Sequence, residues 1–454
     1  MSELPKGTVR RSLKMASLPL GFAGRTAFGL ARRLAGGAED LIRTEIEERT
    51  AKQLFAVIGE LKGGAQKFAQ VLSVMESALP ENLVRPYRAA LTSLQESGPA
   101  LPARAVHTVL REQLGDDWRE LLPEFTDRPV ATASIGQVHR GRWHDGRDVA
   151  VKVQHPGAAE ALTSDFGHLT RMGWIIDRVT GGELDVKEVV AELREQMTEE
   201  LDYLLEAESQ AAFAEAFADD PDFVVPRVVE ATDRVLVAEW LDGTPASVVM
   251  ADGEQEDRDR LGLLLARFHH AGPNRCGLMH ADPHPGNFRL TDDGRLGVLD
   301  FGAVARLPDG LVPWMGPVMR ACADGDPEQM AEVMREAGLL KERKDEGDEK
   351  PEDLGWLSRS MEMLVQPLNE EVFAFDREWM REAVRRATLT KDAEILRSRM
   401  VMHPEHAIVQ RVWMGELAML SQLGARIPYR AEAVAGMPGF EPDPPAPESP
   451  APDS

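Results

Sequence analysis

The sequence predicts an α+β fold in which strands gather in an N-terminal lobe and helices form a larger second lobe. Two runs of β-branched residues, 224–229 and 235–240, are bounded by proline and glycine, as short strands commonly are. Apolar residues recur at helical spacing in 256–270, and this helical periodicity dominates the chain after residue 311. Strands and helices that are segregated along a chain are typical of the α+β class.

The composition limits the class of protein further. A length of 454 residues allows roughly three domains of about 150 residues each. The two cysteines, Cys276 and Cys322, are too few for a disulfide framework and fit a reducing compartment. The formal net charge of −24 would repel phosphates, so no nucleic-acid partner is expected. No apolar run reaches the roughly 18 residues of a spanning helix. We therefore expect a cytoplasmic protein.

The remaining elements follow in order along the chain. A helical pattern extends to about residue 114, a strand-like stretch occupies 130–153, and helical periodicity returns in 186–218. After the two short strands, a hairpin is predicted over 287–300, because Asp292-Asp293-Gly294 is typical of a tight turn.

Two segments differ from the rest of the chain in charge. Residues 1–33 contain seven cations and one acid among leucines and phenylalanines. One interpretation is that this arm contacts the inner face of an anionic membrane peripherally. The alternative is a loosely ordered docking segment. A signal peptide is not expected. The polar segment 341–353 predicts an exposed loop in the helical lobe.

A lysine stands inside a β-branched run, Val149-Ala150-Val151-Lys152-Val153. A buried ammonium needs an anion, and the phosphates of a nucleotide together with a helix glutamate provide one. The alternative is an exposed lysine on an edge strand, where it opposes aggregation.

Three oxygen-bearing side chains follow at the spacing of a kinase catalytic loop and metal loop. They are Asp282 and Asn287, in the segment 280–287 (HADPHPGN), and Asp300, in 300–302 (DFG). Asp282 can accept the proton of an incoming hydroxyl during phosphoryl transfer. Asn287 and Asp300 offer the hard oxygen ligands that Mg²⁺ on nucleotide phosphates requires.

A transition-metal site is the alternative interpretation of the same segment. His280, Asp282 and His284 alternate, and their types would suit zinc or iron. That site would leave Asn287 and Asp300 without a role.

The helix predicted around 195–208 offers carboxylate partners for Lys152. Its acids recur at spacings of four, three and four, away from the apolar face, so several could enter one cleft. A solvated acidic stripe is the alternative. The acids on this face are Glu195, Glu199, Asp202 and Glu206.

Together these segments resemble the UbiB/AarF (ADCK-like) family of atypical protein-kinase-like proteins, which includes the coenzyme Q biosynthesis kinases. The resemblance spans roughly 58–307 and implies a bilobal protein-kinase-like fold with a helical N-terminal extension. Its carriers are Lys67-Phe68-Ala69-Gln70, the loop 131–139 (ATASIGQVH), Lys152, Glu200-Leu201-Asp202-Tyr203 with Glu206, 280–287 and 300–302.

The resemblance also implies a role for each site residue. The catalytic residues would be Asp282, Lys152 and Glu206, with Lys152 and Glu206 paired. Mg²⁺ would be held by Asn287 and Asp300. The nucleotide, ATP or ADP, would be bound by Ala131, Thr132, Ala133, Ser134 and Lys152, with Glu239 to Leu241 as the hinge that meets adenine.

In the family, the helix of the N-terminal motif folds over the active site and excludes protein substrates. Here Lys67 and Gln70 would form this gate, with the Lys67 ammonium near Glu200 and Asp202. Two residues depart from the family pattern: Ala69 replaces a glycine of the motif, and Thr132 interrupts the alanine-rich loop.

These expectations divide the chain into five predicted parts. They are a basic N-terminal arm (1–45), a helical N-terminal extension with the KxGQ-like motif (46–125), a kinase-like N-lobe (126–243), a helical C-lobe with the catalytic and metal loops (244–435) and a disordered Pro/acid-rich tail (436–454).

Two hypotheses about function follow. The first is a magnesium-dependent ATPase or kinase of an unknown small-molecule or lipid acceptor, which supports isoprenoid-quinone or lipid metabolism. The second is a catalytically weak pseudokinase that acts as a nucleotide-gated scaffold. The pathway rests on the resemblance alone.

Overall fold

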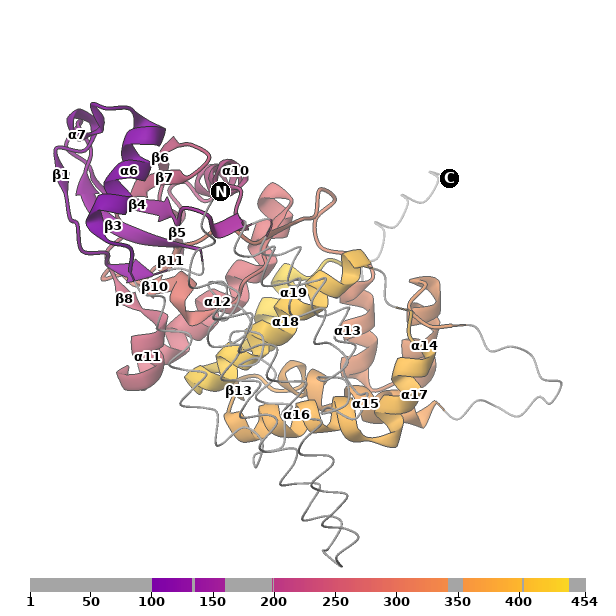
Figure 1. Cartoon of the computed structure of the whole chain (residues 1–454). Coiled ribbons are helices and arrows are strands. Elements are labelled where there is room, and N and C mark those ends of the chain that lie inside the picture. The colour runs from indigo at the N-terminus through magenta and orange to yellow at the C-terminus, as the bar shows by residue number, and fades with distance from the viewer. Residues whose placement is uncertain are drawn as a thin grey trace, which may run out of the picture. The chain divides into compact units, whose positions relative to one another are not determined.

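The computed structural model describes residues 100–132, 135–159, 198, 200–341, 354–401 and 404–440 (Figure 1). They fall into two compact units. The first unit contains the chain up to Glu208 together with Arg227–Trp240, and the second contains Ser209–Pro226 together with the chain from Leu241 onward. The N-terminal arm, the Lys67 motif, most of the 341–353 loop and residues 441–454 of the predicted tail lie outside the described residues. The first residues of the predicted disordered tail are packed, since Gly436 ends a helix and Met437 and Phe440 are buried.

The first unit is built on an antiparallel sheet with the strand order β1-β3-β4-β7-β6, to which β2 adds by pairing with β3. The pairing of β3 with β4 and of β4 with β7 confirms that the stretches predicted at 130–153 and 235–240 contain strands. The strands are β1 (Glu124–Phe125), β2 (Ala131–Thr132), β3 (Gly136–Arg142), β4 (Asp148–Gln154), β6 (Val228–Ala231) and β7 (Val235–Glu239).

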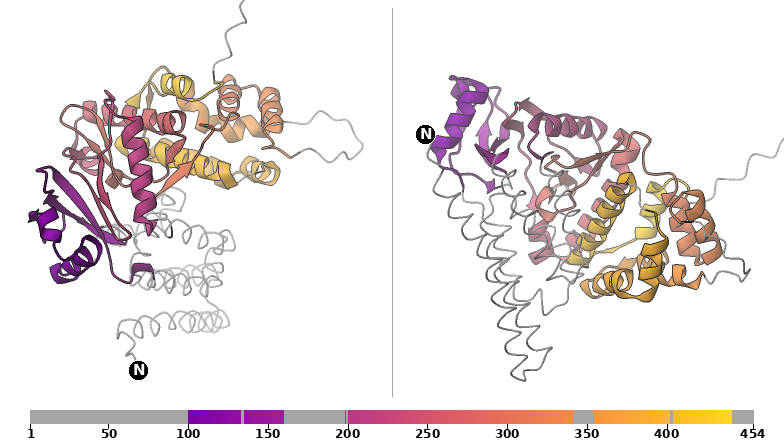
Figure 2. Two further views of the ribbon diagram at one scale, coloured as in Figure 1. Left: turned by 90° about the horizontal axis from the view of Figure 1, so that it is seen from above. Right: turned by 45° about the vertical axis from the view of Figure 1, so that its right-hand side comes forward.

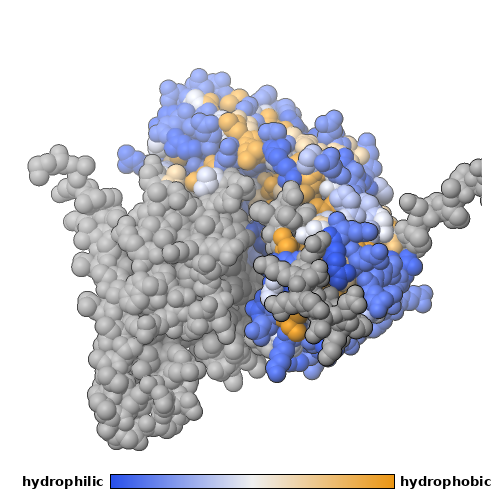
Figure 3. All heavy atoms as spheres, turned by 90° about the vertical axis from the view of Figure 1, so that its right-hand side faces the viewer, coloured by the Kyte–Doolittle hydropathy of each residue, from blue (hydrophilic) through white to orange (hydrophobic). Residues whose placement is uncertain are grey.

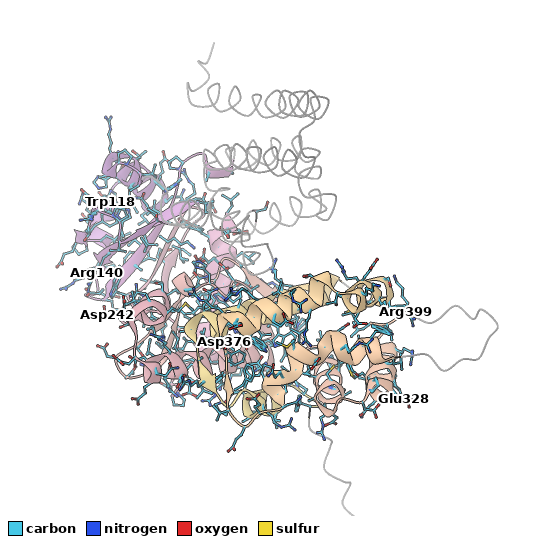
Figure 4. All side chains as sticks on the ribbon, turned by 90° about the horizontal axis from the view of Figure 1, so that it is seen from below. Trp118, Arg140, Asp242, Glu328, Asp376 and Arg399 are labelled. Carbon is cyan, nitrogen blue, oxygen red and sulfur yellow. The ribbon has the colours of Figure 1, made fainter. Side chains whose placement is uncertain are left out.

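Helices α6 (Ala103–Leu114) and α7 (Trp118–Leu121) form the core of the first unit with one face of this sheet. Alternate residues of β4, such as Val151, are fully buried against α6, and Trp118 of α7 joins the same cluster (Figure 4). Because side chains alternate along a strand, Lys152 points to the opposite face.

Helix α10 (Tyr203–Ala216) corrects the continuous helix predicted over 186–218. Thr198 and Glu200 are helical, but the helix is interrupted at Leu201 and Asp202. The Asp202 carboxylate accepts a hydrogen bond from Leu205 N at 3.0 Å, so Asp202 caps the start of α10. Asp202 and Glu206 therefore do not share the face of one uninterrupted helix.

The second unit has its own four-stranded sheet, with the order β5-β11-β10-β8. The hairpin predicted over 287–300 is confirmed, since β10 pairs with β11 in antiparallel register and Gly294 turns with a φ of +78°. A separate pair joins β9 to β12. These strands are β5 (Phe223–Val224), β8 (Thr244–Pro245), β9 (Leu278–His280), β10 (Phe288–Leu290), β11 (Leu296–Val298) and β12 (Val304–Arg306).

The expectation that all strands gather in the N-terminal lobe is wrong. The predicted strand 224–229 is two short strands, of which β5 pairs with β11 in the second unit and β6 with β7 in the first. Pro226 stands between them and has no N–H with which to continue a ladder. The chain thus leaves one unit and enters the other at this proline.

The rest of the second unit is helical, as predicted after residue 311. Figures 1 and 2 show α18 and α19, in yellow, beside α12. Arg267 of α12 forms ion pairs with Glu432 of α19 and with Asp222. The helices are α11 (Ala246–Asp252), α12 (Gln255–Cys276), α13 (Met315–Asp324), α14 (Pro327–Glu336), α15 (Gly355–Val365), α16 (Arg377–Leu389), α17 (Lys391–Arg399), α18 (Pro404–Leu423) and α19 (Tyr429–Gly436), with the strand pair β13 (Phe373–Ala374) and β14 (Arg426–Ile427).

On the face drawn in Figure 3, hydrophilic side chains surround smaller apolar areas. Among the residues that the structure describes, no helix combines the length and the apolar character that a membrane crossing demands.

Candidate active site

Lys152 lies on an interior strand. Its partners in register are Val138 of β3 and Leu236 of β7, so β4 is paired on both sides. The alternative of an exposed edge-strand lysine is therefore wrong.

The ammonium of Lys152 meets a buried carboxylate. Its Nζ lies 2.6 Å from Oε1 of Glu206, in the first turn of α10, and 5.2 Å from the ring centroid of Tyr203. The Lys152 side chain is 14% exposed and that of Glu206 only 2%. The structure thus brings together the two residues that the resemblance paired. A buried ion pair of this kind depends on both partners, because either charge alone would be uncompensated.

Tyr203 and Gly136 have a packing role that the sequence did not reveal. Tyr203 is fully buried. A Cβ placed on Gly136 would come within 2.6 Å of the Tyr203 hydroxyl and 2.8 Å of Val153 O. The glycine of the 131–139 loop is therefore required for the close approach of Tyr203 to β3, next to the Lys152–Glu206 pair.

Gln137 and His139 lie on the other face of the sheet. His139 pairs in register with Val151, which faces α6, whereas Val138 pairs with Lys152. The His139 Nδ1–H donates to Thr126 O at 2.8 Å, and burial lowers the pKa of His139, so the ring is neutral and its Nε2 accepts from the Gln137 amide at 2.8 Å. The Gln137 Oε1 accepts from Leu101 N at 2.7 Å. Gln137 and His139 therefore support β3 on the face of the sheet that packs against α6. They do not face the side on which Lys152 could contact a ligand.

Replacing Gln137 with leucine is expected to lower the free energy of unfolding by about 1–3 kcal/mol, because buried groups at His139 and Leu101 would lose their partner. Urea unfolding measures this change, and Gln410→Leu, at an exposed position of α18, is the control. Equal unfolding midpoints for the two variants would contradict a buried network.

The second unit holds the other candidate catalytic residues. After β9 the chain turns through Asp282 to a 3₁₀ turn, Pro285–Asn287. The Asn287 Nδ2 donates to both O and Oδ2 of Asp282 at 3.1 Å. Since the amide nitrogen makes these bonds, the amide oxygen is the atom with which Asn287 can ligate a metal.

Asp300 follows β11 and has a left-handed backbone with a φ of +58°. Its Oδ1 accepts from Gly302 N at 3.3 Å, and its carbonyl oxygen accepts from Nε2 of His280 at 2.9 Å. His280 is 1% exposed, and burial lowers its pKa, so the neutral ring donates this hydrogen bond. A carboxylate from Asp300 and an amide oxygen from Asn287 are a donor set that suits Mg²⁺.

The zinc or iron alternative is not supported. Within the described ranges, no three His, Cys, Asp or Glu side chains are arranged to hold a metal ion. His280 is engaged with Asp300 O, and Nδ1 of His284 accepts from Gly286 N at 3.1 Å.

Some of the remaining predicted site residues lie within the described residues and others do not. Ala131 and Thr132 form β2, whereas Ala133, Ser134, Lys67 and Gln70 lie outside the described residues. Glu239 ends β7, where its carboxylate accepts from Arg147 at 3.2 Å, and Leu241 begins the second unit. Glu200 lies in the short helical stretch before Asp202, and Asp202 is the α10 cap.

The fold, the paired lysine and glutamate and the Asp-Phe-Gly loop define a protein-kinase-like domain. More particularly, the chain belongs to the ABC1 atypical kinase-like domain family, whose sequence model matches residues 93–334. The predicted family and fold class are therefore confirmed.

Curated relatives include two mitochondrial atypical kinases. The chain is 32% identical to coq-8 of Caenorhabditis elegans over 75% of its length and 29% identical to COQ8B of Rattus norvegicus over 74%. It spans 46% of the first protein and 64% of the second.

A solved structure covers the chain more fully. The complex of Rv3197 with erythromycin, from Mycobacterium tuberculosis, is 42% identical with a TM-score of 0.65, over 89% of this chain and 99% of that one.

Proposed function

We propose that the protein binds ATP with Mg²⁺ and transfers its terminal phosphoryl group to water or to a small-molecule or lipid acceptor. The observation that carries this proposal is the Lys152–Glu206 contact at 2.6 Å, in which a nearly buried carboxylate orients an ammonium. An ammonium held in this way is a ready partner for nucleotide phosphates.

Each residue has a task in this mechanism. Lys152 binds phosphate oxygens while Glu206 fixes its position, and Asn287 and Asp300 supply oxygen ligands for Mg²⁺. The metal ion, when bound, neutralises charge on the phosphates. Asp282, held beside Asn287, accepts the proton of the attacking hydroxyl or water. Ala131 to Ser134 cover the phosphates, and the backbone of Glu239 to Leu241 meets the adenine.

A role in isoprenoid-quinone or lipid metabolism is part of the proposal. It is supported by membership of the ABC1 family and by relatives named coq-8 and COQ8B. Phosphate release by the purified protein, with ATP and Mg²⁺ and with or without phenolic quinone precursors or lipid vesicles, tests it. Stimulated release supports an enzyme. Stabilisation by ATP without any release would favour the nucleotide-gated scaffold instead.

A second candidate is binding of a macrolide. The 42% identity to a protein solved with erythromycin supports it. Titration calorimetry with erythromycin should then give a saturable heat, and a heat equal to that of dilution would reject the idea.

The gate stays a proposal. If Lys67 and Gln70 close over the site near Glu200, Lys67→Ala should permit self-phosphorylation without unfolding the protein, because a lid would be loosened. Mass spectrometry for added phosphate measures this, with Lys62→Ala as the control. If Lys67→Ala contains no more phosphate than the wild type, Lys67 does not form part of the gate.

The basic arm is proposed to contact anionic membranes. Deleting residues 1–33, with their seven cations, should reduce sedimentation with phosphatidylserine vesicles at low salt, where electrostatic attraction is strongest. Neutral phosphatidylcholine vesicles are the control. Equal sedimentation of both proteins with the anionic vesicles would favour a docking arm.

A further inference from the structure

A chain of buried polar side chains runs through the second unit, outside the set of proposed catalytic residues. It involves α12, α18, the first residue of α19 and the last residue of β9. None of its members is more than 7% exposed. The members are His269, Trp413, Glu416, Tyr429 and His280.

The first part of this chain joins the three helices. The His269 Nδ1 lies 3.0 Å from Oε2 of Glu416, and Trp413 Nε1 donates to the Tyr429 hydroxyl at 2.8 Å. Burial, and next the negative charge of Glu416, raise the pKa of Tyr429 well above its usual value. Tyr429 therefore keeps its proton and is close enough to Glu416 to sense its charge.

The second part leads to the metal loop. The rings of His269 and His280 both pack against Phe288 of β10, with centroid distances of 6.2 and 5.4 Å. His280 in turn donates to Asp300 O at 2.9 Å. Tyr429 of α19 is thus connected to the backbone of Asp300 through α18, which carries both Trp413 and Glu416, and then through His269, Phe288 and His280.

The stability of the fold alone does not explain why these buried positions carry polar side chains. When both partners of a buried polar pair are replaced by apolar side chains of the same shape, stability often changes little. Oε1 of Glu416 and Nε2 of His269 are buried and have no hydrogen-bond partner in the part of the chain that the structure describes. Such atoms carry a cost in the folded state. Asp300, by contrast, benefits from support, because its left-handed φ of +58° is uncommon even for aspartate, which adopts it more often than most residues other than glycine.

We propose that Glu416, His269 and Tyr429 are positioning residues that hold Asp300 in its left-handed conformation through Phe288 and His280. The importance of this role rests on the proposed function, in which Asp300 ligates Mg²⁺. Helices α18 and α19 lie beyond residues 93–334, which the family model matches. A C-terminal region outside the matched segment therefore supports the metal loop.

Amide hydrogen exchange of the full-length protein without nucleotide tests the proposal. Glu416→Gln keeps the size of the side chain and removes its charge, and Tyr429→Phe removes only a hydroxyl. Both should speed exchange in a peptide covering 296–304 by about tenfold, since a supported loop opens less often. Glu394→Gln, at an exposed position of α17, should leave it unchanged. If Glu416→Gln fails to fold, Tyr429→Phe decides alone.

Faster exchange confined to α18 and α19, with 296–304 unchanged, would overturn the proposal, because it is what a merely structural role predicts. Phosphate release adds a second readout. Because Asp300 is proposed to ligate the Mg²⁺ of the nucleotide, a positioning role should raise the KM for ATP with Mg²⁺ and lower kcat, whereas a merely structural role should change neither. A wild-type protein that neither binds ATP nor releases phosphate would reject the proposed function. The exchange comparison would still decide whether these residues position Asp300.

Discussion

Replacing Asp300 with asparagine is expected to remove the stabilisation that ATP gives in the presence of Mg²⁺ while leaving the protein folded. The substitution keeps the size of the side chain but removes the charge that we propose as a metal ligand. Loss of one such electrostatic contact in the transition state lowers turnover by about 100- to 1,000-fold. The measurement is a thermal shift with ATP and Mg²⁺, because a ligand that binds the folded state raises the melting temperature.

The matched control for this experiment is Asp309→Asn, since Asp309 is exposed on a loop of the same unit. It should shift with ATP and Mg²⁺ as the wild type does. A full shift in Asp300→Asn would show that Asp300 does not hold the metal ion. A shift that persists when Mg²⁺ is replaced by a chelator would also contradict the assignment.

Replacing Lys152 with alanine is expected to have the second large effect. Removing one partner of a buried ion pair leaves the other charge uncompensated, which costs about 3–5 kcal/mol. Glu206, at 2% exposure, would be that charge. Urea unfolding should report the loss of stability, and nucleotide affinity should fall as well. Lys391→Ala, at the exposed start of α17, is the control.

A double-mutant cycle distinguishes the direct pair from indirect effects. Residues in contact show coupling energies of about 0.5–3 kcal/mol. Lys152→Ala and Glu206→Ala should therefore be less harmful together than the sum of the two single changes. Strict additivity would be inconsistent with the 2.6 Å contact, and coupling to Glu200 in place of Glu206 would identify a different acid as the partner in solution.

Local sequence signals predicted some parts of the fold and misled about others. The hairpin over 288–298 was predictable because Asp292-Asp293-Gly294 encodes its turn within a few residues. The assignment of β5 was not, because its parallel partner β11 is about 70 residues further along the chain. Pro226 is the signal that marks the end of β5, and the β-branched residues on both sides of it obscured that boundary.

The candidate site was also predicted only in part. Lys152 and Glu206 were paired through the family resemblance, and the structure brings them into contact. Asp202 was grouped with Glu206 by spacing alone, although an aspartate before an apolar run is also a signal for the start of a helix. The direction in which Gln137 and His139 point depends on strand register, which pairings between distant segments determine.

The backbone of Asp300 restricts which amino acids position 300 can accept. At a φ of +58°, glycine, asparagine and aspartate are tolerated, whereas valine or isoleucine would strain the chain. A library of all amino acids at position 300 should therefore show two levels of tolerance. More residues should allow the protein to fold than should allow it to bind ATP with Mg²⁺. The same distinction applies to homologues. A natural glycine here would mark a homologue that keeps the loop but lacks the carboxylate that we propose as a metal ligand, whereas a β-branched residue would mark a homologue whose loop has a different backbone.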